Sequence, residues 1–384
     1  MSSHPRATTA TAAGYRRIVA KFGTNLLTAG TDALDIETMS ALVAQVVRLV
    51  DEGREVVVVT SGAIAAGRQK LHAAARRRDI PFRQVLASVG QAQLMQAYDR
   101  LFSASGHVVA QTLVSRRDLA DRIGYLNARN TLLGLLEMRV VPVVNENDVV
   151  AVDEIAGARI GDNDNLSALV ANLIDADLLA LLTDTGGLYT ADPRRSKGAQ
   201  LIPRVDRITK EVEALAGGSD SGRGTGGMVT KLQAAKLATA HGADVYIASG
   251  HEPDVLVRLA HGEHVGTLFP AKASRMESRK RWLRAGLTTR GAIVVDAGAA
   301  RALLERNKSL LPAGVRDVHG SFKRGDTVNI VVAGAEGHPI ASGITNYDAA
   351  DVLAIRGLRS DQIASALGHE YGAEVVHRNN LVLL

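Results

Sequence analysis

The sequence of 384 residues contains no cysteine, which excludes disulfides, thiolate metal ligands and a thiol nucleophile. Aromatic residues make up only 3% of it, so its cores must consist of Val, Leu, Ile and Ala. No apolar run is long enough to cross a bilayer, and the N-terminal MSSHPRATTATAAG has no hydrophobic signal core. The formal net charge of +5 is small for this length and does not by itself imply a nucleic-acid partner. We therefore expect a cytoplasmic protein of two or three globular domains, with a disordered N-terminus at residues 1–13.

The most polar stretch of the chain is Asn145–Leu169 (NENDVVAVDEIAGARIGDNDNLSAL). Two Val-rich runs, Val140–Val144 and Val149–Val152, predict β-structure on both sides of its first polar cluster. Turns, or a helix cap at Asp164 or Asn165, would account for two or three of the polar residues but not for eight. We therefore predict a ligand site made by these acidic and amide side chains: Asn145, Glu146, Asn147, Asp148, Asp162, Asn163, Asp164 and Asn165.

Apolar strands alternate with helical patterns before and after this stretch. We expect strands at Arg17–Phe22, Val56–Val59, Val108–Leu113 and Leu178–Leu182, and helices at Asp35–Val50, Gln84–Ser103 and Gly124–Met138. This alternation predicts an α/β domain with a mostly parallel sheet. Ligands bind at the carboxyl ends of such strands. Residues at or just past those ends should share one site, and they are Lys21, Ser61, Asp148 and Asp184.

Two glycine-containing segments are candidates for phosphate binding. At Thr60–Ala63 a strand turns into a helix, where free amides and the helix dipole favour an anion. Arg68-Gln69 follow where a P-loop has Lys-Ser/Thr, so this is not a Walker A motif. In Gly217–Lys236 a G-x-G-x-x-G pattern has no strand before it, which argues against a dinucleotide site. We expect a loop that admits phosphates, with Lys231 one turn into the next helix; the alternative is a flexible surface loop with a solvated lysine.

Six segments in order resemble motifs of the amino-acid kinase family, and of its glutamate 5-kinase branch in particular. They are AKFGTNLLT, VVTSGAIAAGR, VVPVVNENDVVA, IGDNDNLSALVA, LLTDTGGLYTADPR and GTGGMVTKLQAA. The resemblance extends from about Arg17 to the C-terminus, and the pairing of NEND with GDNDN favours the glutamate 5-kinase branch. It departs at Asn25, where the family often has Ser or Val. It implies a three-layer αβα amino-acid kinase domain at residues 14–270.

The resemblance also implies a reaction: ATP-dependent phosphorylation of the L-glutamate side-chain carboxylate to L-glutamyl 5-phosphate, the first step of proline biosynthesis. Mg²⁺ is expected with ATP as co-substrate, bound mainly to phosphate oxygens and waters. Because the family often forms dimers or tetramers and is often inhibited by proline, we expect both here. A carboxylate with a pKa of about 4.3 is already ionised at neutral pH, so no general base is needed. None of the six motifs contains histidine, and the rate acceleration must come from positioning and from cations.

Matching positions carry the family's roles over to this chain. Lys21 and Lys231 are the implied catalytic cations, and Asp164 holds the two in place. The implied substrate-binding positions are Ser61, Asp148 and Asn163, and the implied nucleotide-binding positions are Lys21, Thr183, Asp184, Thr225, Gly226, Gly227, Met228, Val229, Thr230 and Lys231. An acidic residue such as Asp148 suits the ammonium group of glutamate.

The last part of the chain has a different composition. Residues 271–286 (AKASRMESRKRWLRAG) are expected to form a basic linker. Residues 287–384 show short runs expected as strands at Ala292–Asp296, Gly314–Asp317, Thr327–Val332, Ile340–Thr345 and Leu381–Leu384, with hairpins spaced by Gly334, Gly337 and Gly343. This region resembles a PUA domain, a small mainly-β domain of RNA-modifying enzymes and some glutamate 5-kinases. Its ten Lys/Arg balance its ten Asp/Glu, whereas a phosphate-binding surface needs a basic excess. We expect a structural or regulatory role rather than RNA binding.

Two other functions stay open at this point. One is RNA binding or modification through the C-terminal region, which a salt-dependent gel shift would reveal. The other is phosphorylation of a different carboxylate, such as N-acetylglutamate or aspartate. An acetylated substrate has no ammonium group and would leave a carboxylate at Asp148 without purpose. A fused kinase–reductase is disfavoured, because the chain has no cysteine to form a thioester.

Overall fold

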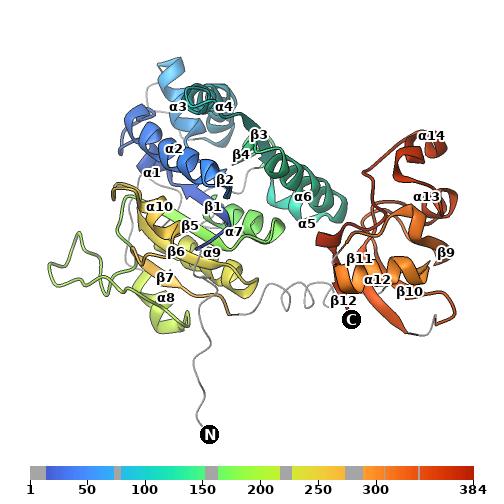
Figure 1. Cartoon of the computed structure of the whole chain (residues 1–384). Helices are drawn as coiled ribbons and strands as arrows, with labels where there is room; N and C mark the ends of the chain where they lie inside the picture. Colours follow the sequence, from blue (N-terminus) through green and yellow to red (C-terminus); the bar gives the residue numbers. More distant parts are fainter. Residues whose placement is uncertain are drawn as a thin grey trace, which may run out of the picture. The chain divides into compact units, whose positions relative to one another are not determined.

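The structure is a computed structural model that describes residues 14–72, 79–151, 163–216, 227–272, 289–306, 308–335 and 338–384. These residues fall into two compact units, one built mainly from residues up to 275 and one mainly from later residues. Each unit contains its own β-sheet (Figure 1). Within the described ranges, no helix is both long and apolar enough to traverse a bilayer.

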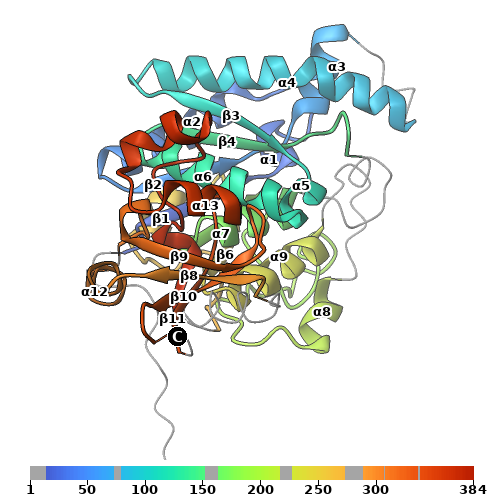
Figure 2. The same cartoon turned by 90° about the vertical axis from the view of Figure 1, so that its right-hand side faces the viewer.

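The first unit has a seven-stranded sheet in the order β3-β4-β2-β1-β5-β6-β7. All neighbouring strands run parallel except β7, which is antiparallel to β6. The strands are β1 (Arg17–Phe22), β2 (Glu55–Val59), β3 (Val109–Val114), β4 (Val141–Glu146), β5 (Leu178–Thr183), β6 (Asp244–Ser249) and β7 (Thr267–Phe269). Helices cover both faces of the sheet (Figures 1 and 2). The prediction of an αβα domain with a mostly parallel sheet is confirmed.

The helices of this part of the chain are α1 (Thr24–Leu27), α2 (Ile36–Asp51), α3 (Ala63–Leu71), α4 (Ile80–Ser103), α5 (Arg116–Ala120), α6 (Arg122–Glu137), α7 (Asn163–Leu173), α8 (Lys210–Ala216), α9 (Met228–Ala240) and α10 (Val255–Ala260). Side chains of β1 alternate between the two faces of the sheet, as strand geometry requires. Ile18, Ala20 and Phe22 pack into a core with residues of α2, α4 and α10. Val19 and Lys21 therefore lie on the other face, against which α7 packs.

The strands expected in this unit are present to within two residues, with one exception. Val149–Val152 is not a strand, because residues 148–150 form a turn in which the Asn147 carbonyl accepts from the amides of Val150 and Ala151. Val152 lies outside the described residues. β4 instead continues through Asn145 and Glu146, which are both buried. Half of the first polar cluster thus belongs to the sheet.

Two glycines allow α3 and α4 to touch. A Cβ on Gly67 would lie 1.9 Å from the Leu86 carbonyl oxygen, and one on Gly90 would lie 1.7 Å from that of Ala63. Any side chain at these positions would force the helices apart. Gly62 begins α3 with a left-handed φ of +104°. The turn before α3 is therefore held closely against α4.

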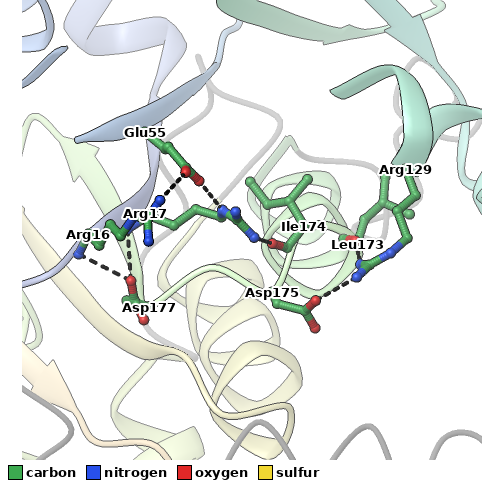
Figure 3. Close-up of polar contacts among 8 residues, drawn as sticks. All are labelled: Arg16, Arg17, Glu55, Arg129, Leu173, Ile174, Asp175 and Asp177. Carbon is green, nitrogen blue, oxygen red and sulfur yellow. Dashed lines mark hydrogen bonds and ion pairs between the residues drawn. The ribbon is translucent and has the colours of Figure 1, made fainter. Parts of the chain in front are cut away.

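The carboxyl end of α7 is held by two arginines from other elements (Figure 3). Arg17 of β1 donates to the Ile174 carbonyl, and Arg129 of α6 donates to the Leu173 carbonyl. Cations at this end of a helix also interact favourably with its dipole. Arg129 is itself buried and pairs with Asp175 at 2.6 Å. These contacts fix the position of α7 relative to β1 and α6.

The second unit has a five-stranded sheet in the order β12-β11-β10-β8-β9. The strands are β8 (Gly291–Val295), β9 (Val315–Gly320), β10 (Thr327–Val332), β11 (Pro339–Ile344) and β12 (Leu381–Leu383). Only β8 and β10 pair in parallel among these described strands. The helices are α12 (Ala297–Arg306), α13 (Ala349–Ile355) and α14 (Ile363–Leu367), with 3₁₀ turns at Pro312–Gly314, Ser360–Gln362 and Arg378–Asn380. A small mainly-β domain is confirmed.

Sequence reasoning missed the helices of this unit and misplaced one glycine. Gly334 lies in the turn between β10 and β11 with φ +83°, as expected for a hairpin. Gly343 instead lies inside β11, where a Cβ would approach Cγ1 of Val376 to 2.6 Å. It is required for close packing and not for a turn. Gly337 lies outside the described residues, as does most of the expected linker 271–286.

Candidate active site

The carboxyl ends of β1, β2, β4 and β5 lie in neighbouring positions in the sheet. Lys21 of β1 is in register with Val59 of β2 and Leu181 of β5, and Val59 is in register with Val144 of β4. The residues that follow these positions are therefore brought to one edge of the sheet, where parallel α/β folds bind ligands. Most of the site residues expected from the sequence lie at this edge.

Asp164, in the first described turn of α7, bridges two lysines from distant parts of the chain. Its Oδ1 is 2.7 Å from Nζ of Lys21, and its Oδ2 is 3.1 Å from Nζ of Lys231. The hydroxyl of Thr230 donates to the same Oδ2 at 2.8 Å. All four residues are buried, Asp164 completely. Asp164 is thus a partner for cations and not merely a helix cap, and Lys231 is not a solvated surface lysine.

The trio of Lys21, Asp164 and Lys231 carries one net positive charge in a buried place. Burying a charge is costly unless it is paired, and Asp164 is a partner of both ammonium groups. An anion placed between the lysines would meet two positive charges that Asp164 holds at fixed positions. Such preorganised cations stabilise charge that develops in a phosphoryl-transfer transition state. The arrangement is therefore suited to a polyanionic ligand.

The N-terminus of α9 contributes a second attraction for anions. Gly227 is the N-cap, and it has no side chain that could bond to the first helical amides. These amides and the helix dipole favour a phosphate group. The expected nucleotide residues Gly227, Met228, Val229 and Thr230 form this end of the helix. Thr225 and Gly226, also expected to bind nucleotide, lie outside the described residues.

Thr183 and Asp184 lie at the end of β5, as expected for the nucleotide side. The Thr183 hydroxyl donates to Oδ1 of Asp184 at 3.0 Å. Oδ2 of Asp184 is 3.1 Å from Arg194 and 3.5 Å from the amide nitrogen of Asn25. Asn25, which departs from the family pattern, therefore connects the segment after β1 to Asp184 at the end of β5. Arg194 was not predicted, although it adds a half-exposed cation to the same edge.

Two of the expected substrate residues are in direct contact. Nδ2 of Asn163 lies 2.7 Å from the Thr60 carbonyl oxygen, 2.9 Å from Oδ1 of Asn145 and 3.0 Å from Oγ of Ser61. Asn145 in turn donates to Oε1 of Gln91 at 2.8 Å. Sequence reasoning missed Gln91, because a single glutamine in a helical pattern has no distinguishing signal.

Asp148, the third expected substrate residue, lies in the turn after β4. Burial and the charge of nearby Glu146 raise the pKa of Asp148 to about 7, and Arg83 partly opposes this rise. A carboxylate with a raised pKa is stabilised in its ionised form when a cation binds beside it. Gln84 of α4 donates to the carbonyls of Asp148 at 3.3 Å and Val149 at 3.0 Å, which holds the turn in place.

The sequence identifies no protein ligand for Mg²⁺. In the part of the chain that the structure describes, no group of three or more His, Asp or Glu side chains is placed to hold a metal ion. Asp153, Glu154 and Asp162 of the polar stretch lie outside that part.

Comparison with known proteins agrees with this geometry. A family model described as "Amino acid kinase family" matches residues 16–249, and one described as "PUA domain" matches residues 291–367. The glutamate 5-kinase of Dehalococcoides mccartyi strain CBDB1 is 54% identical over 370 residues, covering 96% of this chain and 99% of the relative. Glutamate 5-kinases of Herpetosiphon aurantiacus and Deinococcus radiodurans are 52% and 49% identical; each alignment covers 96% of this chain, with 98% and 100% of the relatives. With this match along nearly its whole length, the chain belongs to the amino acid kinase family, within its glutamate 5-kinase branch.

Proposed function

We propose that this protein transfers the γ-phosphoryl group of ATP to the side-chain carboxylate of L-glutamate. The product is L-glutamyl 5-phosphate, and the reaction is the first step of proline biosynthesis. The observation that carries the proposal is the buried Lys21–Asp164–Lys231 trio at the carboxyl edge of the sheet. The names of relatives that are about half identical along nearly the whole chain supply the substrate.

The chemistry follows from the charges of the reacting groups. The glutamate carboxylate is already ionised, so one of its oxygens attacks the γ-phosphorus directly. As that bond forms, the bond from phosphorus to the bridging oxygen breaks and ADP leaves. Negative charge is spread over the attacking, transferred and leaving groups. Lys21 and Lys231 neutralise it from two sides, and Asp164 keeps the two ammonium groups at fixed positions.

On the substrate side, different protein groups bind the ammonium group and the reacting carboxylate of glutamate. Asp148 accepts from the ammonium group of glutamate, which also lowers the raised pKa of this carboxyl by supplying the missing cation. Asn163 donates to Oγ of Ser61 and holds that side chain in place, so the hydroxyl proton of Ser61 is available to orient the reacting carboxylate. Because the two lysines act on the phosphoryl group, substrate selection and catalysis rest on separate residues.

The nucleotide side consists of the N-terminus of α9 and the end of β5. The backbone amides at the N-terminus of α9 donate hydrogen bonds to phosphate oxygens. Thr183 and Asp184 contact the rest of ATP. Mg²⁺ bound to the phosphates supplies further positive charge when ATP is present.

The domain boundaries and the assembly stay proposals. We place the kinase domain at residues 14–270, a linker at 271–286 and the PUA domain at 287–384. Dimers or tetramers, inhibition by proline and a cytoplasmic location are expected by analogy with the family. The balanced charge of residues 287–384 favours a regulatory role for the PUA domain over RNA binding.

One assay tests the proposed function. ATP-dependent formation of an acyl hydroxamate is measured with glutamate, N-acetylglutamate and aspartate in parallel. We expect turnover with glutamate and at most a trace with the other two, because only glutamate combines the right length with a free ammonium group. Preference for N-acetylglutamate would overturn the proposal.

A further inference from the structure

Three side-chain amides form a chain that links α4, β4 and α7. Gln91 of α4 accepts from Asn145 of β4 at 2.8 Å, and Asn145 accepts from Asn163 of α7 at 2.9 Å. Asn163 lies next in sequence to Asp164, so it is the end of the chain near the catalytic trio. Gln91 is the opposite end. The amide chain therefore extends from the reacting groups toward α4.

A backbone carbonyl fixes the direction of all three amides. The oxygen of Thr60 can only accept, so Asn163 must present its NH₂ group to it, at 2.7 Å. Asn145 must then turn its oxygen toward Asn163 and its NH₂ group toward Gln91. Gln91 must in turn present its oxygen to Asn145. The NH₂ group of Gln91 is thereby left as a donor for something else.

That donor is buried and has no partner among the described residues. Nε2 of Gln91 makes no hydrogen bond there, and neither does Oδ1 of Asn163 at the other end. Buried polar groups almost always have a partner, from the protein, water or a ligand. A pure donor at the Gln91 end calls for an acceptor, and a carboxylate is the strongest acceptor that an amino-acid substrate offers.

Helix α4 is held where such a contact needs it. Gly90, next to Gln91, packs directly on the backbone of Ala63 just after the Ser61 turn. Gln84, seven residues before Gln91 and on the same face of the helix, bonds to the turn that carries Asp148. One face of α4 thus contacts both the Asp148 turn and the amide chain.

We propose that Gln91 is a specificity residue that donates to the α-carboxylate of the substrate. The reacting carboxylate must lie near Lys21 and Lys231, at the Asn163 end, so the carboxylate at the Gln91 end is the other one. This inference rests on the proposed function. It explains how the site would select an α-amino acid, since Asp148 alone would accept any compound with an ammonium group at the right distance.

The test uses 4-aminobutanoate, which is glutamate without its α-carboxylate. Gln91→Leu removes both the side-chain oxygen that accepts from Asn145 and the NH₂ group. Gln91→Glu keeps an oxygen that can accept from Asn145 but replaces the NH₂ donor with a second acceptor oxygen. Gln96→Leu, on the exposed face of the same helix, is the control. For each protein, kcat/KM is measured with both compounds, together with the melting temperature.

We expect Gln91→Leu to lower kcat/KM for glutamate by about ten- to a hundredfold, the usual effect of losing a hydrogen bond to a charged group. The value for 4-aminobutanoate should change less than threefold, and Gln91→Glu should be worse than Gln91→Leu with glutamate. Equal losses with both compounds would show a purely structural role and overturn the inference. So would normal glutamate kinetics in Gln91→Glu. If wild-type protein does not phosphorylate glutamate at all, the proposed function itself fails.

Discussion

Strand β1 and helix α7 contact each other through ionic side chains at both ends, and the two contacts differ. The contact at Arg17 and Ile174 is called the base, and the contact at Lys21 and Asp164 is called the site end. At the base, Glu55 pairs with Arg16 and Arg17, and Asp175 pairs with Arg129 (Figure 3). Asp177 accepts from the backbone amides of Arg16 and Arg17. At the site end, two lysines share one carboxylate. The base thus joins structural elements to one another, whereas the site end fixes two lysines at the carboxyl edge of the sheet, where parallel α/β folds bind ligands. Both ends contain buried ions, so the position at the carboxyl edge of the sheet, more than burial, distinguishes the functional end.

The two ends are coupled by the lengths of the elements between them. Four residue steps of extended strand, from Arg17 to Lys21, span about 13 Å. Ten residue steps of helix, from Asp164 to Ile174, span about 15 Å. β1 and α7 run antiparallel, since Arg17 meets Ile174 and Lys21 meets Asp164. The contact at the base therefore helps to set where Asp164 meets Lys21.

The largest effect on activity is expected at Asp148, which lies in the turn after β4 with the carboxylate of Glu146 nearby. Asp148→Asn should raise KM for glutamate by roughly thirty- to several thousandfold, because losing one partner of a buried charged contact costs about 2–5 kcal/mol. KM for ATP should stay within about twofold. Steady-state kinetics with each substrate varied would show this, and an equal rise in both constants would refute the assignment.

Asp164→Asn breaks the site end itself. Its kcat should fall by about a hundredfold or more, the usual scale for losing a preorganised charge. Two buried lysines are left without their carboxylate, so the melting temperature without ligand should fall as well. ATP supplies the missing negative charge and should restore more stability to this variant than it adds to the wild type.

The matched control for this prediction is Asp175→Asn at the base. This variant loses a partner of Arg129 and should also be less stable. Because the base lies at the opposite end of β1 and α7 from the site, ATP should stabilise this variant no more than it stabilises the wild type. Thermal melts of the three proteins with and without ATP separate the two ends. Equal rescue of both variants by ATP would remove the distinction between them.

A smaller effect is expected from pH. Burial and Glu146 raise the pKa of Asp148 to about 7, so glutamate binding requires loss of a proton below that pH. KM for glutamate should fall by up to tenfold per pH unit as pH rises toward 7 and then level off. KM for glutamate is measured for the wild type and Asp148→Asn between pH 5.5 and 8.5. The variant should show no such dependence on pH.

The same shift has a consequence for stability. A carboxyl whose folded pKa lies above its unfolded value stabilises the protein at low pH and loses this contribution as pH rises through about 7. Asp148→Asn should therefore melt at a higher temperature than the wild type at pH 8, and the difference should vanish near pH 4. A lower melting temperature of the variant at pH 8 would contradict the raised pKa.

The smallest effect on turnover is expected at the base. Arg129→Met should lower the free energy of unfolding by about 2–3 kcal/mol, because the Leu173 carbonyl and Asp175 lose their partner. Its kcat, measured well below the melting temperature, should stay within a few-fold of the wild type. Arg16→Met is the control, since the Arg16 side chain is 78% exposed and should matter by less than about 0.5 kcal/mol. Chemical denaturation gives both values.

Much of the first unit could be predicted because its signals are local. Val56–Val59 and Leu178–Leu182 are continuous apolar runs, and such runs are typical of buried parallel strands. The order of strands in the sheet could not be read from local patterns. Val149 and Val150 were assigned to β-structure by their side-chain type, but a backbone turn at Asn147 overrides that preference.

The site was predicted only where residue type and motif coincide. Lys21, Asp164 and Lys231 were assigned through the family resemblance, and the structure brings them into contact. Gln91 could not be found, because its part in the site depends on which elements lie side by side in space. Local sequence contains no information on that proximity.

The central claim, that the two lysines and Asp164 act as one unit, is tested most directly by a double-mutant cycle on kcat. The cycle combines Asp164→Asn with Lys231→Met and compares each single variant with the double variant. Groups that act together are strongly non-additive. We therefore expect Lys231→Met to cost much less in the Asp164→Asn background than in the wild type. Strict additivity of the two losses, or a near-normal kcat of Asp164→Asn, would contradict the account.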